Sequence, residues 1–176
     1  MSRKVNKRII LCGRACSGKD FFKKYCYDAG YSVNVSLVTR PMREGEVNGY
    51  DYHFTSEEEF KGMVDRGELY EHVNFNGTYY GTTVESFNTA EFFIMTPGGI
   101  RQLSEHERKR SLIVYFDIPR TIIMRRMEER GLDTKRIESD DLDFYHFSDF
   151  DIRVPNPNFD PEAVLRVVDC YQMSNL

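Results

Sequence analysis

A glycine-rich loop between an apolar run and a helical segment constrains the fold of this chain more than any other feature. The apolar run RIILC at residues 8–12 predicts a buried strand, and the loop GRACSGKD follows at residues 13–20. Large apolar side chains then recur at helical spacing over residues 17–30, where Gly30 can end the helix. The loop fits G-x-x-x-x-G-K, a pattern that binds phosphate when a strand precedes it and a helix follows. We therefore predict a phosphate-binding loop in an α/β fold.

The residues of this loop predict how a nucleotide would bind. Backbone N–H groups and the helix N-terminus would face the phosphates, and Lys19 would reach the β- and γ-phosphates of ATP. The alternative is a loop that fits the pattern by chance, with Lys19 as a surface lysine. The residues of this segment predicted to bind ATP are Gly13, Arg14, Ala15, Cys16, Ser17, Gly18, Lys19 and Asp20.

Asp20 departs from the pattern, which ordinarily ends in Ser or Thr with a hydroxyl that binds Mg²⁺. Enzymes with this loop also place a Mg²⁺-binding carboxylate at the end of a neighbouring strand. The strand pattern EFFIM at residues 91–95 instead leads into TPGG, without an acid. A carboxylate on the loop would compensate for both losses, so Asp20 is the predicted Mg²⁺ ligand. The alternative is that Asp20 only caps the helix that follows.

The remaining elements alternate along the chain. Apolar runs predict strands at residues 91–95, 111–118 and 151–155, and amphipathic patterns predict helices at residues 56–67, 119–131 and 160–172. Residues 31–41 predict an extended segment, whereas residues 132–150 show only weak periodicity. Strands that alternate with helices favour a parallel sheet with helices on both faces.

Length and charge narrow the class of protein. A chain of 176 residues suits one compact domain, or one core with a small inserted lobe. The net charge of −4 argues against a nucleic-acid-binding protein, whose surface is usually basic. The apolar run near the N-terminus is too short for a signal peptide or a membrane span, so we expect a cytoplasmic protein. Its four cysteines are then expected to be reduced thiols, and the oligomeric state is left open.

A second group of residues predicts a site for a phosphorylated acceptor. Arg40 and Arg43 lie three positions apart, and Tyr52 and Tyr80 offer hydroxyls nearby in the chain. Paired guanidinium groups with tyrosine hydroxyls suit a phosphate. Glu71 stands among apolar neighbours. A buried carboxylate can accept from N1–H and the exocyclic amine of guanine, a pair of donors that adenine lacks.

This block resembles guanylate kinase. The resemblance rests on S-x-x-T-R-P-x-R-x-G-E-x-x-G-x-D-Y-H-F at residues 36–54, followed by G-E-L-x-E-H and Y-Y-G-T in the same order and spacing. It implies a P-loop nucleoside monophosphate kinase fold, with Mg²⁺ and ATP as phosphoryl donor and GMP or dGMP as acceptor. It also implies a core of about residues 1–35, 84–125 and 150–176, an acceptor lobe of about 36–83 and a lid of about 126–149.

The resemblance carries roles over to individual residues. Arg126 and Arg130 match paired arginines that touch the transferring phosphates, although they could instead pair with Glu128 and Glu129 on a basic helix face. Asn156 matches an asparagine near the adenine, or is a plain turn residue. The predicted catalytic residues are Lys19, Arg40, Arg126 and Arg130. The predicted acceptor-binding residues are Ser36, Arg40, Arg43, Tyr52, Glu71, Tyr80, Gly81, Thr82 and Thr96.

The chain also departs from the family pattern. A further lid arginine is replaced by Asp140 or Asp141, and Arg136 is the candidate substitute. Ile94 and Thr96 stand where the family has acidic residues that help to bind guanine. The acceptor is therefore expected to be GMP, dGMP or a less selective mixture.

Two other functions remain open. One is a guanylate-kinase-like binding module that has lost catalysis and holds a peptide. Asp20 and the missing family residues favour this function, whereas the intact loop at residues 13–19 disfavours it. The other is a kinase of another small phosphorylated acceptor, such as a ribose bisphosphate. Glu71 disfavours that activity, because a sugar needs no guanine-binding carboxylate.

Overall fold

The computed structural model describes residues 7–173 and contains a parallel sheet at its centre. The strand order is β6-β1-β7-β8. The strands are β1 (Arg8–Gly13), β6 (Phe92–Ile94), β7 (Ser111–Phe116) and β8 (Ile152–Val154), all paired in parallel. Continuous apolar runs such as β7, in which every residue is buried, are typical of parallel strands covered on both faces.

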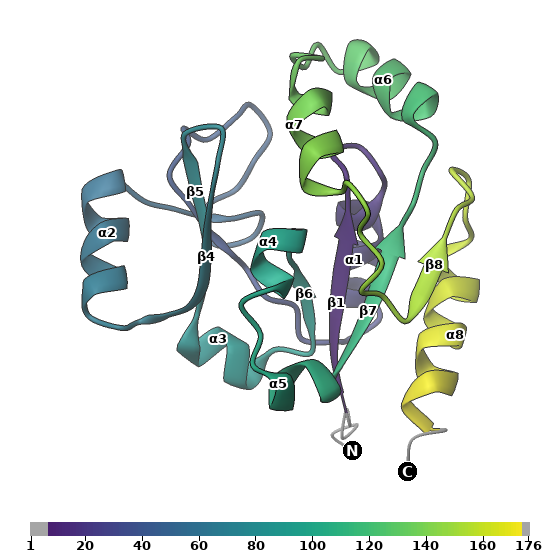
Figure 1. The fold of residues 1–176 in the computed structure, drawn as a ribbon, viewed down its shortest axis with the longest axis horizontal. Coiled ribbons are helices and arrows are strands. Elements are labelled where there is room, and N and C mark those ends of the chain that lie inside the picture. Colours follow the sequence, from purple (N-terminus) through teal and green to yellow (C-terminus); the bar gives the residue numbers. More distant parts are fainter. Residues whose placement is uncertain (1–6, 174–176) are drawn as a thin grey trace.

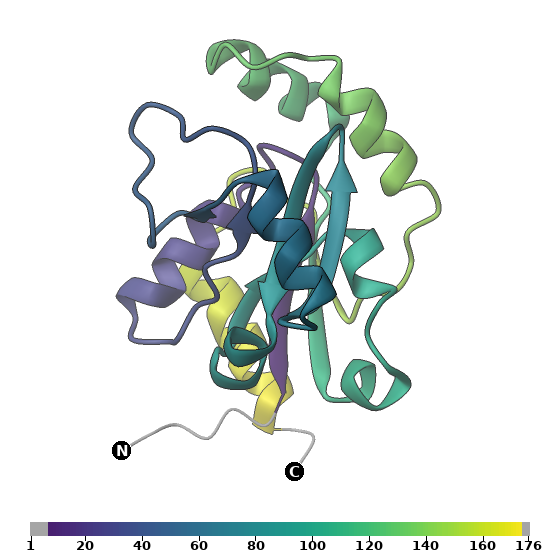
Figure 2. The same ribbon diagram turned by 90° about the vertical axis from the view of Figure 1, so that its left-hand side faces the viewer.

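Alternation along β1 divides the interior into two cores. Ile9 and Leu11 face one core, whereas Ile10 and Cys12 face the other, because successive side chains of a strand point to opposite faces. Helices α1 (Lys19–Asp28) and α8 (Pro161–Met173) cover the first face. Helices α3 (Val84–Thr89), α4 (Pro97–Ile100) and α5 (Glu105–Lys109) lie over the second (Figures 1 and 2). The predicted α/β architecture is confirmed.

A second four-stranded sheet stands beside the first, in the order β3-β2-β5-β4 (Figure 1). Its strands are β2 (Leu37–Val38), β3 (His53–Phe54), β4 (Leu69–Phe75) and β5 (Thr78–Thr83). The turn between β4 and β5 is Asn76–Gly77, with both residues at positive φ, as a tight hairpin requires. No strand is predicted from the sequence for residues 68–83, although this N-G pair was a hairpin signal.

Helix α2 (Glu57–Asp65) covers the outer face of this second sheet. Ser56 caps it, because its hydroxyl oxygen accepts from the N–H of Glu59 at 3.1 Å. Phe60 is fully buried and packs against the ring of Tyr79. A Cβ at Gly81 would lie 3.0 Å from the Phe60 ring, so the glycine allows this close packing.

Helices α6 (Arg120–Glu129) and α7 (Arg136–Asp143) lie above the carboxyl ends of the central strands (Figures 1 and 2). Helix α6 confirms the prediction for residues 119–131, and Gly131 follows its end at φ +62°. Helix α7 was not predicted, because Ile137 is its one buried apolar residue. Within residues 7–173, no helix is long and apolar enough to cross a membrane.

Candidate active site

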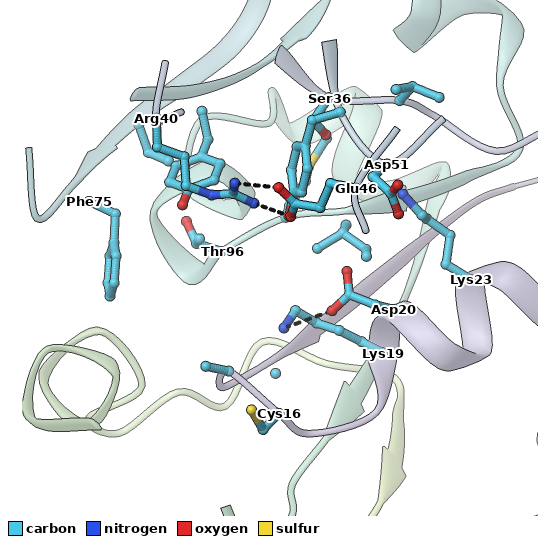
Figure 3. Close-up of a pocket in the computed structure, with 18 of the residues that line it drawn as sticks. Cys16, Lys19, Asp20, Lys23, Ser36, Arg40, Glu46, Asp51, Phe75 and Thr96 are labelled. Carbon is cyan, nitrogen blue, oxygen red and sulfur yellow. Dashed lines mark hydrogen bonds and ion pairs between the residues drawn. The ribbon is translucent and has the colours of Figure 1, made fainter. Parts of the chain in front are cut away.

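A cavity of about 560 Å³ lies at the carboxyl ends of the central strands and extends to the second sheet. Figure 3 shows Lys19 and Asp20 at one side of this cavity, with Arg40 and Glu46 across from them. Of the predicted site residues, the cavity is lined by Gly13, Ala15, Cys16, Lys19, Asp20, Ser36, Arg40, Arg43, Tyr52, Glu71, Tyr80, Gly81, Thr96 and Arg130. The fold thus brings residues from both predicted sites into one space.

The phosphate loop connects β1 to α1. A Cβ at Gly13 would lie 2.7 Å from the Oγ of Ser17, and Gly18 takes φ +98°, so both positions favour glycine. The Nζ of Lys19 donates to the carbonyl oxygen of Arg14 at 3.1 Å, which holds the lysine across the loop. The Oγ of Ser17 is buried without a hydrogen-bond partner among the described residues. The close contact between Gly13 and Ser17 and the hydrogen bond from Lys19 to Arg14 thus make this a compact loop.

Residues of α6 contact the phosphate loop from above. The guanidinium of Arg126 donates to the carbonyl oxygen of Cys16 at 3.1 Å and to that of Pro157 at 2.6 Å. Arg130 lines the cavity, with its Nη1 3.9 Å from the Sγ of Cys16. Helix α6 thus brings positive charge to the loop, and two further arginines of this helix form ion pairs, Arg125 with Glu129 and Arg120 with Asp141.

Asp20 lies in the first turn of α1, where its carboxylate is 64% exposed and 3.7 Å from the Nζ of Lys19. The N-cap of α1 is Gly18, so Asp20 is not the capping residue by position. Mg²⁺ commonly binds one or two carboxylates and takes its other ligands from water and phosphate oxygens. An exposed carboxylate beside Lys19 fits such an ion. In the described part of the chain, no group of three His, Cys, Asp or Glu residues could hold a metal by itself.

Arg40 and Glu46 form an ion pair through two hydrogen bonds of 2.6 Å (Figure 3). Glu46 also accepts from the backbone N–H of Arg43 at 2.8 Å. The hydrogen bonds from Arg40 are the main reason that the pKa of Glu46 lies below its ordinary value. The guanidinium of Arg40 further lies 5.1 Å from the centre of the Tyr52 ring. Glu46 therefore fixes the position of Arg40 on the wall of the cavity.

Glu71 is a buried carboxylate in the lining of the cavity. It is 5% exposed, and its Oε1 accepts from the hydroxyl of Thr82 at 2.8 Å. Burial raises its pKa to about 7, against the opposing effect of the hydrogen bonds from Thr82. Gly99 at the start of α4 makes room for this carboxylate, since a Cβ there would lie 2.9 Å from Oε2. The arrangement suits a ligand group that carries hydrogen-bond donors.

A hydrogen-bond network continues behind Glu71. Asn34 is fully buried, and its Nδ2 donates to the Oγ of Ser36 at 2.9 Å and to the Oγ1 of Thr82 at 3.4 Å. Its Oδ1 accepts from the hydroxyl of Ser86. Asn34 thus connects two predicted acceptor-binding hydroxyls.

A family model described as Guanylate kinase matches residues 5–164. The chain belongs to the guanylate kinase family. The guanylate kinase of Ruegeria sp. (strain TM1040) is 30% identical, with the match covering 91% of this chain and 81% of the relative. That of Sulfurimonas denitrificans is 29% identical over 96% of this chain and 89% of the relative.

Other guanylate kinases match over shorter segments. That of Enterococcus faecalis is 40% identical over 46% of this chain, and the match spans 41% of the relative's own length. The crystal structure of guanylate kinase from Anaplasma phagocytophilum shares the fold at a TM-score of 0.69 and 20% identity. That superposition covers 98% of this chain and 87% of the solved chain.

Several residues predicted from the phosphate-loop pattern or from the guanylate kinase resemblance are not among the described residues that line the cavity. Thr82 lies behind Glu71, and Arg14 is turned toward Asp141, 3.0 Å away. The Oδ1 of Asn156 accepts from the N–H of Asn158, so this side chain closes a turn of its own segment. The predicted residues that do not line the cavity are Arg14, Ser17, Gly18, Thr82, Arg126 and Asn156.

Some residues at or beside this cavity were not predicted from the sequence. Glu46 stands inside the recognised R-x-x-R-x-G-E segment, so an acid at that position was an available signal. Thr96, predicted to bind the acceptor, lines the cavity but also accepts from the N–H of Gly99 at 3.2 Å. Asn34 and Gly99 carry no local signal, because their roles depend on contacts across the fold.

Proposed function

We propose that this protein is a nucleoside monophosphate kinase that transfers the γ-phosphoryl group of ATP to GMP or dGMP. The observation that carries the proposal is the position of three groups in one cavity. The phosphate loop with Lys19 lies at one side and Arg40 lies across from it (Figure 3), while Arg43 and the buried Glu71 line the same cavity. A donor phosphate, an acceptor phosphate and a base with hydrogen-bond donors would then occupy neighbouring positions.

The acceptor would bind between the arginines and Glu71. Arg40 and Arg43 would hold the phosphate of GMP, together with the hydroxyls of Ser36, Tyr52 and Tyr80. Arg43 would bind the phosphate through two parallel hydrogen bonds, which fixes the orientation of the phosphate. Arg40 already gives two parallel hydrogen bonds to Glu46, so it would contribute its remaining N–H groups and its charge. Glu71 would accept from N1–H and the exocyclic amine of guanine, while Gly81, Thr82 and Thr96 shape the surrounding wall.

The donor would bind at the phosphate loop, through residues 13–20, with Asn156 proposed near the adenine. Lys19, Arg126 and Arg130 would offset negative charge as the phosphoryl group passes between two anions. Asp20 is the residue that would hold Mg²⁺, which would neutralise phosphate charge when bound. The protein's contribution is then to place the phosphates in line and to exclude water, without a covalent intermediate.

The proposed domain organisation follows the two sheets and the helices above them. The core would be about residues 1–35, 84–125 and 150–176, of which 1–6 and 174–176 lie outside the described residues. The acceptor lobe would be about 36–83 and the lid about 126–149. We expect the lobe and the lid to approach each other when both nucleotides bind. A cytoplasmic location also stays a prediction.

The test is turnover with ATP, Mg²⁺ and each of GMP, dGMP, AMP, CMP and UMP, measured as ADP formed. We expect GMP or dGMP to react far faster than the others, and Lys19→Ala to lower kcat by a factor on the order of 100 to 1,000 while the protein stays folded. Equal rates with all five acceptors would contradict the guanine assignment.

A binding module is the second candidate, because an aspartate of α7 occupies a backbone N–H of the phosphate loop. GMP binding without any ADP formation in the same assay would favour that function. Turnover with a ribose phosphate but not with GMP would instead favour a kinase of another small phosphorylated acceptor.

A further inference from the structure

Two successive aspartates of α7 contact the phosphate loop. The Oδ2 of Asp140 accepts from the backbone N–H of Ala15 at 2.7 Å, and Asp140 is only 4% exposed. Asp141 pairs with the Nε of Arg14 at 3.0 Å and with the Nε of Arg120 on α6 at 2.8 Å. Helix α7 is therefore bound to the loop at two adjacent points.

The contact to Ala15 uses a donor that a phosphate would need. Backbone N–H groups of this type of loop donate to phosphate oxygens. The N–H of Ala15 points at a carboxylate oxygen, which resembles a phosphate oxygen in charge and in accepting hydrogen bonds. A phosphate oxygen and Asp140 cannot both take this donor at normal distances, and their negative charges would repel each other.

Helix α7 also reaches the second sheet. The Oγ of Ser139 donates to the Oδ1 of Asn76 at 3.0 Å, and the guanidinium of Arg136 lies 5.4 Å from the centre of the Phe75 ring. Its apolar packing is limited, since Ile137 is buried while Leu142 is 79% exposed. Polar contacts therefore contribute a large share of what holds α7 over the cavity.

We infer that Asp140 occupies a donor-phosphate position in the ligand-free protein and thereby sets the affinity for ATP. The inference rests on the proposed function, because it takes the phosphate loop as the donor site. ATP binds only when Asp140 has left the N–H of Ala15. The apparent affinity for ATP is therefore the affinity of the open form multiplied by the fraction of molecules that are open. Asp141 acts as a positioning residue, because its pairs with Arg14 and Arg120 hold Asp140 at the loop.

The experiment measures binding of ATP, ADP and adenosine by titration calorimetry in the absence of metal. Asp140→Asn keeps the shape and removes the charge, whereas Asp140→Ala also removes the acceptor. The matched control is Glu138→Gln, which removes the same charge from an exposed position of α7. We expect both Asp140 variants to bind ATP and ADP roughly tenfold more tightly than the wild type. Adenosine affinity should stay unchanged, because adenosine places no phosphate in the loop, and Glu138→Gln should resemble the wild type.

Equal or weaker binding of ATP by both Asp140 variants would overturn the inference. Hydrogen exchange of the Ala15 amide in the wild type gives a second measurement that needs no variant. We expect this amide to be protected without ligand, and rapid exchange would contradict the contact. If neither the wild type nor Asp140→Ala binds ATP or ADP, the proposed function fails and the inference fails with it. Equal binding by both overturns only the inference.

Discussion

The hydroxyl of Thr82 donates a hydrogen bond to the buried carboxylate of Glu71 at 2.8 Å. Burial has the larger effect and raises the pKa of Glu71 to about 7. In the folded protein without ligand, Glu71 therefore changes its charge near neutral pH. A base that donates two hydrogen bonds needs the ionised form, so ligand affinity and pH should be linked.

The first prediction is that GMP binds more tightly as pH rises from 6 to 8. With a pKa of about 7, the ionised fraction of Glu71 rises roughly tenfold over this range, and the dissociation constant should fall by a similar factor. The phosphate of GMP also titrates near pH 6. Glu71→Gln is therefore the control. In this variant the dissociation constant of GMP should still change as the phosphate titrates, but the change near pH 7 should disappear. An identical pH profile in the variant would contradict the assignment of Glu71.

The second prediction concerns the glycine beside that carboxylate. Gly99→Ala would place a Cβ 2.9 Å from the Oε2 of Glu71 and should displace the carboxylate. We expect kcat/KM for GMP to fall roughly ten- to hundredfold, because small displacements of positioned groups lower the rate by factors of this order. Gly98→Ala is the matched control, because its Cβ would meet Thr96 and Val73 at an ordinary 3.4 Å. Equal losses in the two variants would point to a general effect on α4.

The third prediction assigns Asn34 as a positioning residue. Its Nδ2 donates to Ser36 and Thr82, so the hydrogen of each hydroxyl is left to point elsewhere, toward Glu71 in the case of Thr82. Asn34→Asp has the same shape but cannot donate, and should raise the KM for GMP roughly tenfold with the KM for ATP unchanged. Ser86→Ala removes the hydrogen bond to the Oδ1 of Asn34, on the side away from the cavity, and should lower stability without this change in KM.

The parts of the fold that the sequence predicted are those specified by local patterns. Residues 8–30 contain a buried strand, a glycine loop and an amphipathic helix in direct succession, and each is recognisable without the rest of the chain. Helix α7 is different, because its docking depends on Asp140 and Asp141. The acidic segment at residues 132–150 shows only weak hydrophobic periodicity, so the sequence did not indicate a helix there.

The site shows the same division. Arg40, Arg43 and Glu71 were predicted because they stand in recognisable segments, and all three line the cavity. Gly99 could not be predicted in this way. It becomes important only because α4 packs against the carboxylate of Glu71, which lies in the second sheet. Contacts between elements far apart in the sequence were therefore the part that needed the structure.

The last prediction concerns Asp20 and Mg²⁺. Its carboxylate is exposed in the cavity beside Lys19, and the N-cap position of α1 belongs to Gly18. Without metal, this negative charge should repel the phosphates of ATP, whereas with Mg²⁺ it should contribute a ligand. We therefore expect Asp20→Ser to bind metal-free ATP roughly tenfold more tightly and to gain less affinity from added Mg²⁺ than the wild type. Asp28→Asn removes the same charge from the far end of α1, where Asp28 pairs with Lys24, and should leave both affinities unchanged. The measurement is ATP binding by calorimetry with and without Mg²⁺, which separates metal-dependent affinity from turnover. If Asp20→Ser and the wild type show the same affinities under both conditions, Asp20 contributes only a favourable charge to the first turn of the helix.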